Sequence, residues 1–233
     1  MCGRYSLTLQ GMKVVRDELA DVRIQLRTLQ PRYNIAPGQL APVFRLDGGT
    51  MRIATLRWGL IPSWARDAKF GFQCVNARAE TVASKPAFRS AFRKRRCRVP
   101  ADGFYEWQPV GGRKQPWYFA RPDGDLLEFA GLWESWSPPD GGPPVETFTL
   151  CTTTPNAVAA PIHDRMPVIL SAQDATIWTD PEASPEALCA VLRPAPDDLL
   201  ARYPVSPVVN NARNDVPECV MPLSTLESGP DSH

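Results

Sequence analysis

Closely spaced turn signals in the middle of the chain set the strongest limit on its fold. Glycine- and proline-rich turns occur at 111–112, at 122–124 and between Pro138 and Pro144. The runs that they separate are rich in β-branched and aromatic residues, which is typical of strands. The predicted strands cover residues 95–108, 116–120, 126–132 and 145–153. Short turns between consecutive strands indicate a meander, so we expect an antiparallel sheet.

The flanking segments add further strands and a few helices. Strands are expected at residues 3–9, on both sides of the Asp47-Gly48-Gly49 turn and at 203–209. Helices are expected at residues 12–29 (closed by Pro31), 171–179 (with Ser171 as N-cap) and 184–192. No repeat or long linker divides the chain. We therefore expect one α+β domain over residues 2–222, with a disordered tail at 223–233.

The composition is that of an ordinary globular protein. Of the 233 residues, 43% are hydrophobic and 22% are charged. There is no run of about 18 apolar residues and no signal-peptide pattern. The six cysteines are scattered without a CxxC pair, and only two histidines accompany them. We therefore expect a cytoplasmic protein without a membrane anchor, a metal site or a cofactor.

Charge is distributed unevenly along the chain. Residues 1–165 hold 23 Lys and Arg against 15 Asp and Glu, whereas residues 166–233 hold 3 against 10. Arginine outnumbers lysine 21 to 5, and arginine suits bidentate phosphate contacts. A GC-rich genome also enriches arginine, so the uneven distribution is the better indication of a polyanionic partner.

The first five residues, Met1-Cys2-Gly3-Arg4-Tyr5, suggest unusual chemistry. Removal of Met1 would leave Cys2 with an α-amine and a thiol on adjacent carbons. Both groups are partly nucleophilic near neutral pH, and we expect the ammonium to lower the pKa of the thiol. Such an aminothiol can serve as a hydrolase nucleophile or can trap an aldehyde as a thiazolidine. The alternative is a cysteine that only opens a strand.

Two further residues are candidates for proton transfer. Glu106 lies between aromatic residues on a predicted strand, where it is either solvated or held in a pocket that raises its pKa. His163 lies in a polar loop beside Asp164 and Arg165. It is either a structural histidine or the first candidate for a general acid or base near pH 7.

Two polar segments are candidates for binding a sugar-phosphate. Asn76, Arg78 and Glu80 alternate and share one face if the segment is extended. Residues 85–98 hold seven basic residues and no acid, with Phe88 and Phe92 four positions apart on a predicted helix. Each segment is either a plain solvated face or part of a nucleic-acid surface.

Taken together, six segments resemble the SOS response-associated peptidase (SRAP) family. They are MCGRY, RYNIAPGQ, WGLIPSW, NARAET, GFYEW and PIHDRMP, and they follow the family's order over about residues 2–170. The resemblance implies a barrel-like sheet core with flanking helices. It also implies a protein that shields abasic sites in single-stranded DNA by a covalent thiazolidine cross-link, with peptidase-like removal of residue 1 and a possible lyase activity. We expect this protein to be a nucleoid-associated monomer.

The resemblance also implies roles for individual residues. The catalytic residues would be Cys2, Asn76, Glu106 and His163. The DNA-binding residues would be Arg4, Asn34, Pro37, Trp64, Arg78 and Arg165. Some relatives carry a second aromatic residue after the position of Trp64, but here it is Ala65, which leaves the stacking contact open.

Two other classes of function remain open from the sequence. A glutamine amidotransferase or another hydrolase with an N-terminal nucleophile also begins with Met-Cys-Gly, but that class leaves the basic 85–98 segment unexplained. The third class is a non-covalent binder of single-stranded or modified DNA, with Cys2 as a bystander.

Overall fold

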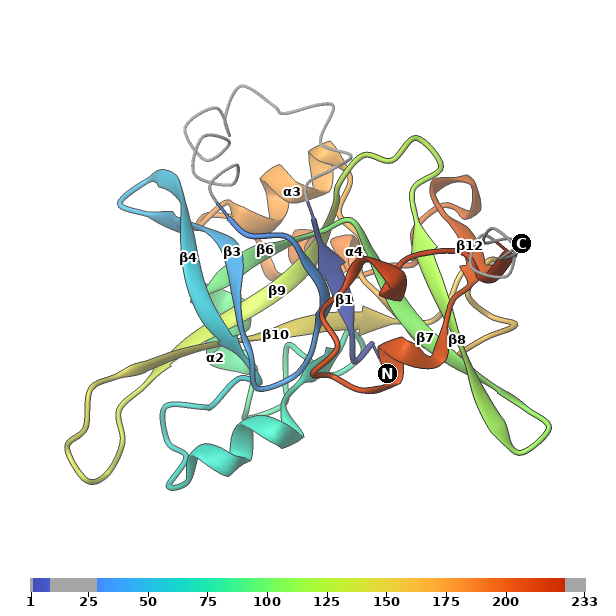
Figure 1. Ribbon diagram of the computed structural model, residues 1–233. Coiled ribbons are helices and arrows are strands. Elements are labelled where there is room, and N and C mark those ends of the chain that lie inside the picture. Colours follow the sequence, from blue (N-terminus) through green and yellow to red (C-terminus); the bar gives the residue numbers. More distant parts are fainter. Residues whose placement is uncertain (1, 9–28, 225–233) are drawn as a thin grey trace, which may run out of the picture.

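The computed structural model describes residues 2–8 and 29–224, and strands dominate it (Figure 1). The strands are β1 Tyr5–Leu7, β2 Arg32–Ile35, β3 Leu40–Asp47, β4 Thr50–Trp58, β5 Asn76–Arg78, β6 Arg96–Ala101, β7 Gly103–Val110, β8 Arg113–Ala120, β9 Leu127–Trp136, β10 Val145–Thr153, β11 Met166–Pro167 and β12 Ala201–Pro204. The helices are α2 Arg89–Lys94, α3 Ala172–Thr179 and α4 Pro185–Val191, with short 3-10 turns η2 Ala68–Gln73, η3 Asp197–Leu199, η4 Pro207–Asn210 and η5 Pro217–Cys219. The helix expected over residues 12–29 falls almost wholly outside the described residues.

The strands form two sheets, and the expected α+β fold with a barrel-like core is confirmed. One sheet has the order β12-β8-β7-β1-β2, and all of its neighbours are antiparallel. In the other sheet, β10 pairs with both β4 and β9, so β10, β4, β3, β6 and β9 close into a ring. The β10–β4 and β10–β5 pairs are parallel, which the meander pattern did not indicate.

Large aromatic side chains fill the core between the sheets. The Tyr5 ring lies 5.2 Å from the Trp58 ring, and Phe104 stacks on Phe119 at 4.8 Å between centroids. Gly103 is required by a close approach, because a Cβ at this position would lie 2.3 Å from the Phe119 carbonyl oxygen. β1 and β7 lie side by side as an antiparallel pair, with Tyr5 opposite Phe104.

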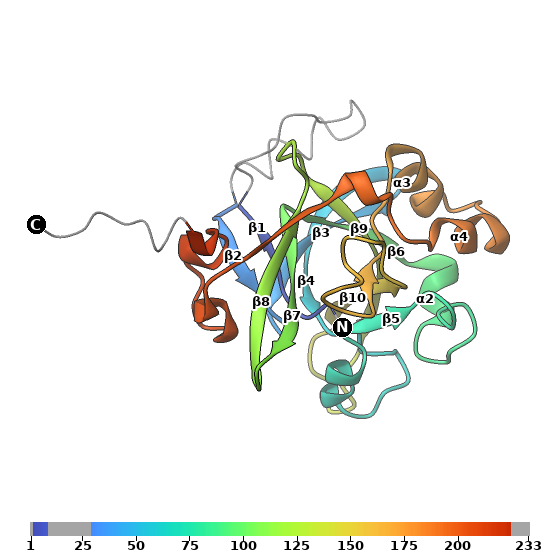
Figure 2. The same cartoon turned by 90° about the vertical axis from the view of Figure 1, so that its right-hand side faces the viewer.

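α2 and α3 pack against β6 and β9, and α4 packs against α3 (Figure 2). Ser171 begins α3 as predicted, in a capping box with Asp174. Phe88 and Phe92 are both about 1% exposed, so this pair packs inward as expected. No helix in the described ranges is long and apolar enough to span a membrane.

The strand predicted at 203–209 is wrong in its position. The pairing of β12 with β8 ends at Pro204, and Ser206 then caps the 3-10 turn η4, which begins at Pro207. Proline has no N–H group to donate to a sheet, and its fixed φ suits the first position of a helical turn. The apolar pattern of this segment therefore reflects packing of a turn rather than a strand.

Candidate active site

The short segment before β1 places Cys2 inside the protein. β1 lies between β2 and β7, and Cys2 is fully buried in the central core. Its sulfur lies 4.0 Å from the Arg4 carbonyl oxygen. Burial raises the pKa of the thiol, and the Glu106 carboxylate raises it further. In the chain that still carries Met1, desolvation outweighs the effect of the terminal amine on the thiol. The lowered pKa expected for Cys2 after removal of Met1 stays a prediction.

Asn76 on β5 reaches the Cys2 backbone. Its Nδ2 donates a hydrogen bond of 2.9 Å to the Cys2 carbonyl oxygen. The Asn76 Oδ1 is buried, and no described residue donates a hydrogen bond to it. The parallel pairing of β5 with β10 sets this contact, since it aligns Asn76 with Leu150. An acceptor is thus available beside Cys2 for a donor on a bound molecule.

Glu106 lies in the interior rather than in solvent. It is 2% exposed and belongs to β7, where it pairs with Trp117 of β8. Desolvation raises the pKa of its carboxyl group to about 7. Of the two alternatives open from the sequence, the pocket is correct. A carboxyl group with this pKa can both give and take a proton near neutral pH.

His163 faces Glu106 from the loop before β11. Its Nε2 lies 3.8 Å from the Glu106 Oε2, and its Nδ1 accepts a 3.0 Å hydrogen bond from the Arg165 backbone N–H. That bond leaves the proton of the neutral ring on Nε2, facing Glu106. The Asp164 Oδ1 lies 3.0 Å from Nδ1, but burial lowers the pKa of His163 overall, which favours the neutral ring. Cys2, Asn76, Glu106 and His163 therefore meet at one place.

Arg165 is bound within the protein. Its Nη1 and Nη2 donate to the two carboxylate oxygens of Glu80, at 2.6 and 3.0 Å, and Nη2 also donates to the Thr152 carbonyl oxygen at 2.6 Å. Glu80 lies in a turn after β5, not on an extended strand as the alternation suggested. Arg78 is exposed at the end of β5.

Arg4 and Asn34 hold the C-terminal part of the fold. The Arg4 Nη1 donates to the Asn34 Oδ1 at 2.8 Å and to the Val209 carbonyl oxygen at 2.7 Å. Asn34 is fully buried, and its Nδ2 donates to the carbonyl oxygens of Val209, Asn211 and Asn214. Their role as DNA contacts stays a prediction, while their structural role is visible here.

Two aromatic side chains, Trp64 and Phe72, are exposed, and Phe72 lies beside the 36–38 loop. Trp64 is 55% exposed and contacts Phe70 edge to face at 5.1 Å, and Pro37 is half-buried. Phe72 is 61% exposed, and its ring lies 3.6 Å from the position that a Cβ of Gly38 would occupy. Phe72 was not among the residues expected from the sequence. The paired aromatics in Phe70-Gly71-Phe72, close after Trp64, could have indicated it.

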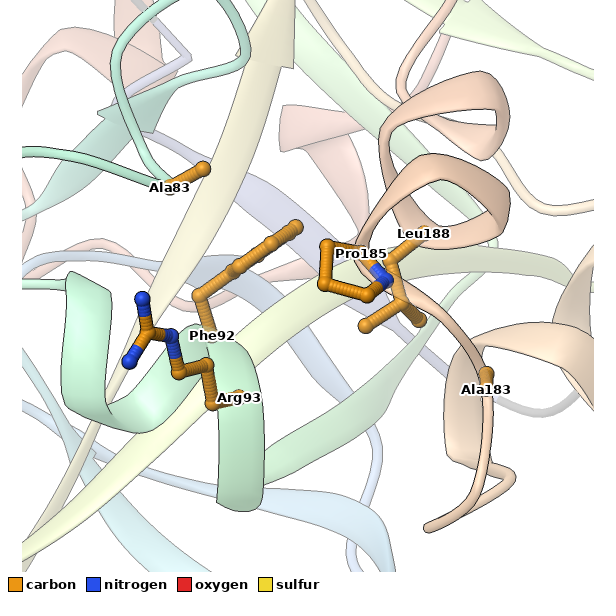
Figure 3. Close-up of a pocket in the computed structure, with 6 residues that line it drawn as sticks. All are labelled: Ala83, Phe92, Arg93, Ala183, Pro185 and Leu188. Carbon is orange, nitrogen blue, oxygen red and sulfur yellow. The ribbon is translucent and has the colours of Figure 1, made fainter.

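An apolar pocket of about 220 Å³ lies between α2 and α4 (Figure 3). It is lined by Ala83, Phe92, Arg93, Ala183, Pro185 and Leu188. These residues include no acid, thiol or imidazole, so the pocket is not the chemical site. Within residues 2–8 and 29–224, no three His, Cys, Asp or Glu side chains are grouped to hold a metal ion.

Comparison with known proteins identifies the family. The model of the SOS response associated peptidase (SRAP) family matches residues 1–212. The chain belongs to the SRAP family. The abasic site processing protein YoqW of Bacillus subtilis is 40% identical to this SRAP chain over 222 residues, covering 94% of the chain and 99% of YoqW.

Two other comparisons extend this result. The abasic site processing protein HMCES of Gallus gallus is 36% identical over 265 residues, covering 96% of this chain and 78% of HMCES. A crystal structure of a protein from Bacteroides thetaiotaomicron has a TM-score of 0.80 and 27% identity, covering 95% of this chain and 99% of that one. The SRAP fold thus extends over most of the chain.

Proposed function

We propose that this SRAP protein binds abasic sites in single-stranded DNA and joins them covalently to Cys2 as a thiazolidine, after Met1 has been removed. One observation carries the proposal: a buried carboxyl group with a pKa of about 7, Glu106, lies close to a buried Cys2 whose carbonyl is held by Asn76. The family relatives named as abasic site processing proteins support the same substrate.

The side chains suit the required proton transfers. The ring-opened sugar presents an aldehyde, and the Cys2 amine adds to its carbon. Glu106 then protonates the departing hydroxyl, so that water leaves and an iminium ion forms. The thiol adds to the iminium carbon and returns its proton to Glu106. One water is released, and Glu106 ends in its starting state.

This order of reaction steps is consistent with the raised pKa of the Cys2 thiol. A neutral thiol carries the proton that Glu106 must recover, so both groups complete one cycle without an outside acid. Ring opening also needs a proton at the ring oxygen, which Glu106 or the Nε2–H of His163 supplies. The free Oδ1 of Asn76 accepts a hydrogen bond from the sugar or the amine.

Single-stranded DNA binding would combine phosphate contacts with stacking. Arg78 is exposed and can contact a phosphate group directly, while Arg4 and Arg165, which already donate to protein acceptors, would contribute mainly their positive charge. Such contacts make binding depend on salt rather than on base sequence. Trp64 and Phe72 are exposed rings on which bases can stack. Phe72 supplies the second aromatic surface that Ala65 lacks. Lyase cleavage through the iminium ion and self-removal of Met1 are further parts of this proposal.

A cross-linking assay tests the function. The protein is incubated with an oligonucleotide carrying one abasic site and analysed on a denaturing gel. We expect a heat-resistant adduct that is lost in Cys2→Ala and after borohydride reduction of the aldehyde, and that forms more slowly in Glu106→Gln. The absence of any adduct with the wild-type protein would refute the proposal. Glutaminase activity without DNA would favour the hydrolase class instead.

A further inference from the structure

Glu80 makes a two-pronged ion pair with Arg165 at the edge of the site. The side chain of Arg165 is 13% exposed and that of Glu80 is 50% exposed. Their hydrogen bond lowers the pKa of Glu80, so the pair is charged at neutral pH. Two parallel bonds fix the plane of the guanidinium group as well as its position.

The same arginine orients the imidazole of His163. The backbone N–H of Arg165 is the donor to His163 Nδ1, and the Arg165 side chain is tied to Glu80 and to the carbonyl oxygen of Thr152 on β10. Residues 163–165 are therefore held by a contact with the turn after β5 and by a contact with β10. Asn76, which holds Cys2, begins the same β5 strand.

These contacts leave few donors of Arg165 for a phosphate group. Both terminal nitrogens already donate to Glu80, and Nη2 donates to Thr152 as well. The Nε–H is buried, and no described residue accepts a hydrogen bond from it. Occupied in this way, Arg165 is placed to fix the His163 loop more than to hold DNA.

We propose that Glu80 is a positioning residue, which acts through Arg165 to hold the Nε2–H of His163 toward Glu106. This inference rests on the proposed function, since it concerns the proton transfer that forms the adduct. The Glu80–Arg165 pair would join the segment that carries Asn76 to the segment that carries His163. The amine and thiol of Cys2 and the Nε2–H of His163 would then keep their relative positions during the reaction.

The structure offers a matched control for the test. Glu146 on β10 pairs with Arg45 of β3 at 2.7 Å, and its side chain is 37% exposed, with Arg45 at 17%. This ion pair resembles the Glu80–Arg165 pair in length and exposure. Glu80→Gln and Glu146→Gln therefore remove the same charge from comparable pairs, one at the site and one outside it.

The experiment separates DNA binding from reaction. Affinity is measured by fluorescence anisotropy with an oligonucleotide that carries a tetrahydrofuran abasic analogue, which cannot form an aldehyde. The first-order rate of adduct formation is measured at saturating protein with a true abasic site. For Glu80→Gln we expect the rate to fall about tenfold and the affinity to change less than about twofold. Glu146→Gln should match the wild type in both.

A double-mutant cycle shows whether the effect passes through His163. In a His163→Ala background, Glu80→Gln should slow adduct formation no further. A wild-type rate in Glu80→Gln would overturn the inference, and so would an equal extra loss in the His163→Ala background. A tighter affinity with an unchanged rate would show instead that Glu80 competes with phosphate for Arg165. Failure of the proposed function is distinct, because the wild-type protein would then give no adduct.

Discussion

Replacing Glu106 with glutamine should stabilise the protein at pH 8 while it impairs the chemistry. The carboxyl group is 2% exposed, and burial raises its pKa from the ordinary 4.5 to about 7. Between these two pH values the folded protein keeps a proton on Glu106, whereas the unfolded chain releases it. The free energy of unfolding therefore falls as the pH rises from about 4.5 to about 7.

The size of this effect follows from the two pKa values. Each unit of pKa corresponds to about 1.4 kcal/mol, so Glu106 costs the folded protein about 3 kcal/mol once it is fully ionised. Glutamine carries no titrating proton and has nearly the same shape. The Glu106→Gln variant should therefore gain about 3 kcal/mol over the wild type between pH 4.5 and pH 8.

Urea denaturation at several pH values measures this difference. The quantity of interest is the free energy of unfolding of Glu106→Gln minus that of the wild type, since the other titrating groups cancel in it. Glu182→Gln, on an exposed loop, serves as the control and should follow the wild type at each pH. A difference that stays constant from pH 4.5 to 8 would refute the argument that desolvation sets the pKa of Glu106.

Four further substitutions test other parts of the structure. Asn34→Ala should lower the free energy of unfolding by about 2–3 kcal/mol, because three carbonyl oxygens lose the donor that they share; urea denaturation measures this. Gly103→Ala should be destabilising by more than about 3 kcal/mol, since its methyl group would clash with the Phe119 carbonyl oxygen; a thermal midpoint near that of the wild type would contradict this. Trp64→Ala and Phe72→Ala should each weaken binding of single-stranded DNA by about 1–3 kcal/mol in anisotropy titrations, and equal loss with double-stranded DNA would argue against stacking.

Local signals in the sequence predicted much of the framework. The turn at 111–112 and the alternation around it correctly indicated the β7–β8 hairpin. Ser171 correctly marked the start of α3, because N-capping depends on a few adjacent residues. Burial of Phe88 and Phe92 followed from helical spacing alone.

The arrangement of the site depends on contacts between distant residues, which no local pattern reveals. The parallel pairing of β5 with β10 brings Asn76 to Cys2, across 74 positions of the chain. The burial that raises the pKa of the Cys2 thiol also comes from the assembled core, so the first five residues alone do not reveal it. The resemblance to a family supplied the site residues, but not the exposed Phe72 or the attachment of Arg165 to Glu80.

The bonds from Arg4 to the far end of the domain have a consequence for the timing of assembly on the ribosome. Arg4 and the Val209 carbonyl oxygen that it contacts are 205 positions apart, and Asn34 binds the same carbonyl. Synthesis proceeds from the N-terminus, so Cys2 emerges long before the residues that fix its surroundings. Removal of Met1 by an aminopeptidase during translation would therefore precede the placement of Glu106 and His163 around Cys2. In that order of events, the reactive environment of the aminothiol is completed last.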